Sequence, residues 1–140
     1  MAAAQPVALW VTGKGRHLLM PNGYARPLEG DENLALPQLI DRLSKATAPG
    51  ASEGTQIQQS VLNTALALIQ RMPTLGSIRY DQDIGISFQL IDSDLFVYWG
   101  DDRNFETKLQ NMQAAQKLVT SGQAVGTVID VRTPERPFVK

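Results

Sequence analysis

Apolar positions along the chain recur with two different periods, and the helical period is clearest over residues 55–73. Apolar residues there return every three or four positions and form one stripe, as expected for an amphipathic helix. The stripe consists of Ile57, Val61, Leu62, Ala65, Leu66, Ile69 and Met72. Pro73 ends the predicted helix, because the residue before a proline is forced out of helical geometry.

A second helix is predicted over residues 103–122. One side of it carries Phe105, Leu109, Met112, Ala115 and Val119. Asp101 and Asp102 precede it, where acids cap a helix and complement its dipole. Gly122 is the expected stop.

Strand patterns occupy much of the remaining chain. Residues 7–12 and 16–20 form two strands around a Gly-Lys-Gly turn, and residues 84–91 and 95–99 form a hairpin around Asp-Ser-Asp. Residues 37–46 are expected to form a short helix, since proline suits its first position. A last strand follows the second helix.

Strand pairs separated from two substantial helices predict the α+β class, with a mixed β-sheet and both helices packed on it. A right-handed crossover would place the last strand beside a hairpin strand and parallel to it. The 140 residues fit one domain, residues 1–140.

Composition argues against several function classes. The net charge is −1 and no cluster of Lys and Arg is present, so nucleic acid is not an expected partner. Cysteine is absent, which excludes disulfides, thiol catalysis and thiolate metal sites. No apolar run reaches the length of a membrane span, and residues 1–13 lack the pattern of a signal peptide.

Candidate chemistry is sparse. His17 is the only histidine, and a metal site or a nucleophile would need further groups beside it, so a structural role in the hairpin is expected. Gly13 and Gly15 bracket Lys14 between two strands, which predicts a turn and not a phosphate loop. We therefore expect no cofactor and no metal.

Acids occur in three pairs, which are Asp81 with Asp83, Asp92 with Asp94, and Asp101 with Asp102. Paired carboxylates can perform acid–base catalysis when their surroundings separate their pKa values. Each pair lies at an expected turn or cap, where Asp is common for conformational reasons. The two tryptophans lie within strands and are expected in the core or on a sheet face.

The chain ends on a strand that contains Pro134 and Pro137. Proline lacks an N–H group and is tolerated at a sheet edge but not in the middle of a sheet. An edge with unpaired backbone groups can accept a strand from another chain. We expect residues 129–132 to pair on one side with the domain's own sheet.

This ending permits two interpretations, a partner-binding edge or a frayed terminus. In the first, Arg132 and Arg136 are available to acids of the partner. The expected partner-binding residues are Val131, Arg132, Thr133, Pro134, Glu135, Arg136, Phe138 and Val139.

Four short motifs, in the same order, resemble the C-terminal extracytoplasmic β domain of the FtsQ/DivIB cell-division family. They are LLMPNGYA at 18–25, LALPQLID at 34–41, VYWGD with FETKLQNMQAAQKLV at 97–119, and IDVRTPERPFVK at 129–140. The chain departs from the family pattern in lacking an acid before Gly23 and in carrying Pro137.

The resemblance implies a non-catalytic scaffold of the divisome with an FtsQ/DivIB-like β domain and a terminal edge strand. It also implies partners of the FtsB and FtsL type, bound by the last strands. The family's membrane anchor and POTRA domain would lie upstream, which places this part on the extracytoplasmic face of the bacterial membrane. The resemblance therefore favours the partner-binding edge.

Two other functions remain open. An envelope-associated adaptor could use a similar sheet to bind a different peptide. A small hydrolase or lyase could use one of the Asp pairs with His17.

Overall fold

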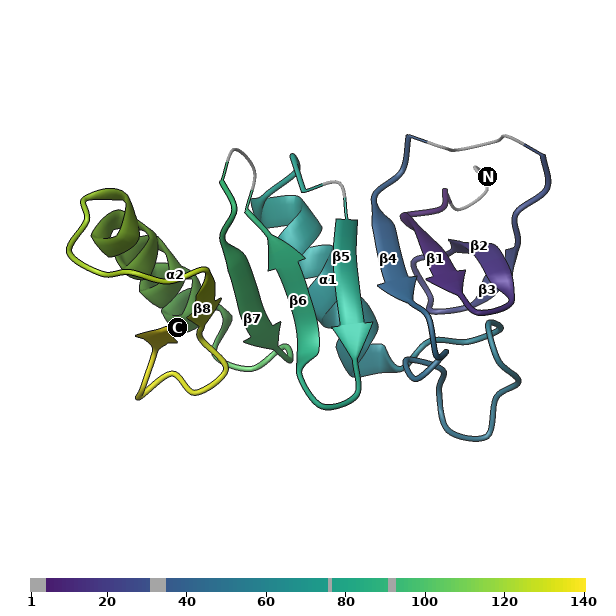
Figure 1. Ribbon diagram of the computed structural model, residues 1–140. Helices are drawn as coiled ribbons and strands as arrows, with labels where there is room; N and C mark the ends of the chain where they lie inside the picture. The colour runs from purple at the N-terminus through teal and green to yellow at the C-terminus, as the bar shows by residue number, and fades with distance from the viewer. Residues whose placement is uncertain (1–4, 31–34, 76, 91–92) are drawn as a thin grey trace.

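The computed structural model of the protein describes residues 5–30, 35–75, 77–90 and 93–140 (Figure 1). Nine strands form one mixed sheet in the order β3-β2-β1-β4-β5-β6-β7-β8-β9, which agrees with the predicted α+β class. The strands are β1 (Ala8–Thr12), β2 (Gly15–Leu19), β3 (Ala25–Pro27), β4 (Gln38–Asp41), β5 (Ser77–Asp81), β6 (Gly85–Gln89), β7 (Phe96–Gly100), β8 (Val128–Asp130) and β9 (Phe138–Val139).

Two helices, α1 (Gln59–Arg71) and α2 (Phe105–Thr120), lie on the same face of this sheet, behind it in Figure 1. Both helices were predicted, and each buries residues of its predicted stripe, such as Val61 and Leu62 in α1 and Leu109 in α2. The predicted stop at Gly122 is confirmed, since that glycine follows the helix with φ of 79°. Neither helix of the described residues has the length and apolarity to cross a membrane.

One row of buried side chains crosses seven strands on the face that the helices cover. The register of the sheet places one residue of each strand directly opposite one residue of the next strand. Side chains of residues that lie opposite one another point to the same face of the sheet. This apolar row consists of Trp10, Leu39, Ile78, Phe88, Val97, Ile129 and Val139, and all but Val139 are at most 1% exposed. It is the centre of the hydrophobic core. Trp99 is also fully buried, so both tryptophans lie in the core as expected.

The opposite face of the sheet, called the open face below, has no helix on it (Figure 1). The pleat turns the residues beside the apolar row toward this face. Their register gives a second row of Ile40, Arg79, Ser87, Tyr98, Asp130 and Phe138. This open-face row is polar or only partly buried for most of its length, as expected for a sheet face without a second layer.

The helix predicted over residues 37–46 is wrong, because residues 38–41 form β4 between β1 and β5. Leu39 is buried in the apolar row and fixes the segment as a strand. Asp41 then accepts hydrogen bonds from Trp10 Nε1 at 3.1 Å and from the backbone N–H groups of Lys45 and Ala46. These tertiary contacts outweigh the local helical preference of the segment.

The predicted cap at Asp101 and Asp102 is also wrong. The helix α2 starts after Asn104, which has left-handed backbone angles and makes no side-chain cap bond. Asp101 instead accepts a hydrogen bond from the backbone N–H of Arg103, two residues later. This Asx turn redirects the chain before the helix begins.

The predicted hairpin is confirmed, and so is the place of the following strand beside it. Strands β6 and β7 pair antiparallel, and β8 lies beside β7 and parallel to it. The end of the expected strand at Ile91 lies outside the described residues. Gly85 and Gly100 face each other where the pairing of β6 with β7 shifts, and a Cβ on Gly85 would lie 2.7 Å from the Gly100 carbonyl oxygen. Glycine is therefore required at this close approach.

Ile129 is the best test of the apolar row, because it lies fully buried between Val97 and Val139. Ile129→Ala should lower the free energy of unfolding by about 2–5 kcal/mol, since it leaves a cavity that the sheet cannot close. Thr127→Ala, at an exposed position just before the same strand, should change it by less than about 0.5 kcal/mol. Urea denaturation of both variants measures this, and equal effects would contradict the assignment of the core.

Candidate functional site

The predicted partner-binding segment folds back on itself at the end of the chain. After β8 it turns and returns as β9, so that Ile129 pairs with Val139 and Asp130 with Phe138. The strand β8 therefore lies between β7 and β9, and the expectation that residues 129–132 pair on one side only is wrong. The edge strand at this end of the sheet is β9 instead.

The two prolines have separate positions in this turn. The N–H of Arg136 donates to the carbonyl of Thr133, which closes a turn with Pro134 at its second position, where proline is favoured. Pro137 directly precedes β9 and supplies no N–H. Prolines thus shape the turn and the entry to the edge strand, as their avoidance of central strands predicts.

Three contacts hold β9 and the turn before it in place. The backbone of Lys140 exchanges two hydrogen bonds of 2.9 Å with Val128, and the amide of Asn111 in α2 donates to the carbonyl of Pro134 at 3.1 Å. Gly126 lies against β9 so closely that a Cβ there would be 2.6 Å from Cγ1 of Val139. The terminal segment is thus packed against the domain and is not frayed.

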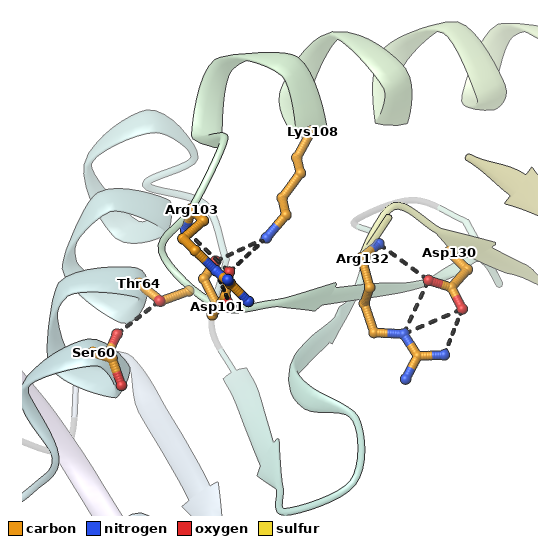
Figure 2. A network of polar contacts seen from close by, with 7 residues as sticks. All are labelled: Ser60, Thr64, Asp101, Arg103, Lys108, Asp130 and Arg132. Atoms are coloured by element: carbon orange, nitrogen blue, oxygen red, sulfur yellow. Dashed lines mark hydrogen bonds and ion pairs between the residues drawn. The ribbon is translucent and has the colours of Figure 1, made fainter. Parts of the chain in front are cut away.

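A buried carboxylate lies under this segment (Figure 2). Asp130 is 2% exposed and accepts hydrogen bonds from the backbone N–H, Nε and Nη2 of Arg132, the last at 2.7 Å. Lys140 Nζ lies 3.7 Å from the same carboxylate. Desolvation raises the pKa of Asp130, but the hydrogen bonds and charges of Arg132 and the charge of Lys140 together lower it. Asp130 is therefore held as an anion.

Cations and aromatic rings share the surface above this carboxylate. Arg132 and Lys140 lie over the ring of Tyr98 at 5.3 and 5.0 Å from its centroid, and Lys140 also lies 5.3 Å from that of Phe138. These distances are within the range of cation–π attraction. Phe138 is 47% exposed and is the large apolar side chain that this edge presents to solvent.

The other predicted site residues divide by exposure. Val131 is fully buried, so its side chain belongs to the core and cannot contact a partner. Val139 is half-buried within the apolar row, and Pro134 is half-buried in the turn. The exposed members are Arg132, Thr133, Glu135, Arg136 and Phe138.

The outward backbone groups of β9 follow from its register. In an antiparallel pair, residues alternate between exchanging hydrogen bonds with the opposite strand and pointing away from it. Lys140 exchanges bonds with Val128, so Val139, one position earlier, turns its N–H and C=O away from β8. These two groups are placed to bond a further strand.

A second polar cluster lies at the entry to α2 (Figure 2). Lys108 is 1% exposed, and its Nζ donates to the carbonyl and to Oδ1 of Asp101, each at 3.1 Å. Arg103 Nε donates to the other carboxylate oxygen at 2.8 Å. Desolvation raises the pKa of Asp101, but the bonds from Arg103 and Lys108 outweigh it and lower the pKa to about 2. This cluster fixes α2 to the end of β7.

His17 has the structural position that its isolation in the sequence predicted. It is buried in β2, shares a hydrogen bond of 3.1 Å with Thr12, and lies under the loop at Gly54. Burial lowers its pKa, and its Nδ1 has no hydrogen-bond partner among the described residues. Gly13 and Gly15 form the tight turn expected between β1 and β2, and Lys14 pairs there with Glu53.

The pair of Asp81 with Asp83 is not brought to His17. Asp81 ends β5 and accepts N–H bonds from Asp83 and Ile84 within the turn, as expected of a turn residue. β1 and β4 separate this strand from that of His17. Asp92 lies outside the described residues. Among the residues that the structure describes, no three potential ligands gather into a metal site.

Sequence reasoning missed Tyr98, Asn111 and Gly126 as parts of this site. The alternation along β7 could have placed Tyr98 on the opposite face from Val97 and Trp99. No sequence signal identifies Asn111 or Gly126, because their partners come from the folded-back segment. Comparison of the chain with models of protein families and with curated proteins finds no match.

The low pKa of Asp101 has a consequence in acid. The folded state holds this carboxylate ionised more strongly than the unfolded chain, so its contribution is complete above pH 3.8 and is lost as pH falls toward 2. Asp101→Asn should therefore lower the melting temperature at neutral pH and flatten its decline between pH 4 and 2. Calorimetry across this range tests it, with Asp102→Asn as the control. A decline as steep as that of the unaltered protein would exclude Asp101 as its source.

Proposed function

We propose that the chain is the β domain of an FtsQ/DivIB-like protein, a non-catalytic scaffold of the bacterial division machinery. Its partners are division proteins of the FtsB and FtsL type, which add a strand to β9. The location proposed for it is the extracytoplasmic face of the membrane, with the anchor in an upstream segment. The proposal rests on the four collinear sequence motifs together with the free edge.

The observation that carries the proposal is the outward N–H and C=O of Val139 in the last strand of the sheet. A strand added there gains main-chain hydrogen bonds, which are the usual source of affinity in this mode of binding. The absent N–H of Pro137 and the shortness of β9 limit the register in which a second chain can pair. Such restraint favours one matched partner over general aggregation.

Side chains beside the edge supply specificity. Phe138 is exposed on the open face, and Arg136 is an exposed cation in the returning segment. Arg132 is already bound to Asp130, so the expectation that it is available to acids of the partner is wrong. Arg136 forms no ion pair among the described residues, and its planar guanidinium can bind a carboxylate with two hydrogen bonds. A partner strand with an apolar residue beside Phe138 and an acid nearby would match this surface.

Phe138→Asp tests the docking role of β9. The exposed ring contributes little to the core, and the new carboxylate lies opposite Asp130 at a cost of about 0.2–1 kcal/mol, so the melting temperature should fall by no more than about 5 °C. The dissociation constant for the FtsB- and FtsL-type proteins of the same organism should rise at least tenfold, because a charge replaces a central apolar contact. Isothermal titration and a thermal melt measure the two effects.

Tyr24→Asp is the matched control for this experiment. Tyr24 is an aromatic residue of 56% exposure beside β3, at the other end of the sheet. Its replacement should leave binding unchanged. If both variants bind as tightly as the unaltered protein, β9 is not the docking edge. If the unaltered protein binds neither division protein but binds another envelope peptide through β9, the adaptor function replaces the proposal.

Gly126→Ala displaces the edge without changing any residue of it. The added methyl group would overlap Val139 and the carbonyl of Lys140, both within 2.8 Å of the new Cβ. The strand β9 should therefore separate from β8, and partner binding should weaken even though residues 131–139 are intact. Amide hydrogen exchange at residues 138–140 reports the separation. Weaker binding with unchanged exchange would show that the methyl group acts elsewhere.

A further inference from the structure

A hollow of about 680 Å³ lies on the open face, and two residues at its edge, Tyr98 and Val128, also contact Lys140 next to β9. It extends from the end of β4 across β5 and β6 to β7 and β8, and its volume is within the range of ligand sites. Its lining includes Ile40, Leu43, Arg79, Phe96, Tyr98 and Val128. Leu43, just after β4, is 74% exposed and presents an apolar side chain beside the hollow.

Three cations line the hollow without carboxylate partners in the described part of the chain. Arg42, Lys45 and Arg79 are exposed, and no carboxylate of the described residues forms an ion pair with them. Arg79 lies over the ring of Phe96 at 5.9 Å from its centroid. This stacking orients the guanidinium and leaves its N–H donors available to a ligand.

Two of the acids that line the hollow accept hydrogen bonds from other groups of the chain. Asp41 is buried and bonded to Trp10 and to two backbone N–H groups. Asp81 accepts N–H bonds within its own turn, where Asp83 is exposed. The exposed charges of the lining are therefore positive at Arg42, Lys45 and Arg79, and negative at the end of β5 and in the turn after it.

We propose that this hollow binds an acidic peptide segment of a partner protein. A carboxylate of the segment pairs with Arg79, and adjacent apolar side chains of the same segment cover Ile40, Leu43 and Val128. Cations beside exposed apolar groups are complementary to a segment in which acids alternate with apolar residues. The main contacts of the peptide, Arg79 and Leu43, lie outside β9, so the proposal does not depend on binding of the division partners there.

The chemistry of the lining favours a peptide over other anions. A free phosphate would use the cations but would leave Leu43 and Ile40 exposed to water. A nucleic acid draws most of its affinity from many neutralised phosphates, and three cations beside two exposed acids provide little of this. A mixed surface of this kind is typical of a transient protein contact.

The experiment uses the full chain and a phage-displayed library of random 12-residue peptides. Selected peptides are synthesised, and their affinities are measured by fluorescence polarisation. We expect sequences rich in Asp or Glu next to Leu, Ile or Phe. Arg79→Glu should weaken their binding at least about tenfold, as expected for loss and reversal of a charge-assisted contact.

Arg16→Glu is the matched control, because Arg16 is an exposed strand arginine beyond β1 and outside the hollow. It should leave the affinity within twofold of the original. Leu43→Ser should also weaken binding, which separates an apolar contact from attraction of charge alone. Thermal melts confirm that each variant is folded.

Several results would overturn the inference. These are a selection that yields no binding peptide, peptides without acids, or acidic peptides that bind the Arg79→Glu variant as tightly as before. Acidic peptides whose binding is abolished by Phe138→Asp and not by Arg79→Glu would place the contact at β9. That outcome would support the proposed function while excluding the hollow.

Discussion

The structure depends on one constraint, the alignment of an apolar side chain from each of seven strands into a single buried row. Because neighbouring residues in a strand point to opposite faces, this row also fixes which residues face solvent. Val139 joins the row at its end, and Phe138 is consequently turned outward. A shift of one residue in the pairing of β8 with β9 would exchange these roles. The exposed aromatic at the edge is thus a consequence of core packing.

The parts of the fold that the sequence predicted are those with a complete local pattern. The stripe of residues 55–73 and the two runs around Asp-Ser-Asp contain enough apolar positions to define their period. The strand β4 could not be recognised, because Leu39 is its one member of the apolar row and Pro37 suggested a helix start. The pairing of β9 could not be recognised either, since two residues after a proline carry no period. The prolines themselves correctly indicated an edge.

Two buried carboxylates stabilise the sheet by different means. The burial of the Asp41 carboxylate is compensated by hydrogen bonds from neutral groups, which are an indole N–H and two backbone N–H groups. Asp130 is compensated by charge, through Arg132 and Lys140. A buried charge is tolerated when it is paired and fully hydrogen-bonded. In the second case the compensating cations also stack on Tyr98 and thereby form the surface beside the candidate docking edge. Core electrostatics and surface chemistry are therefore linked at this end of the sheet.

The order of the last strands in the sheet has a consequence for folding during synthesis as well as for binding. Strands β5, β6 and β7 are joined in chain order as a meander, whereas β8 reaches β7 only after α2 has been passed. Local pairings form before distant ones. The edge of β7 that later pairs with β8 is therefore expected to stay unpaired while the following residues are synthesised. Residues 126–140, which include β8, close that edge. Their arrival ends the period in which nascent chains could join to one another by this edge.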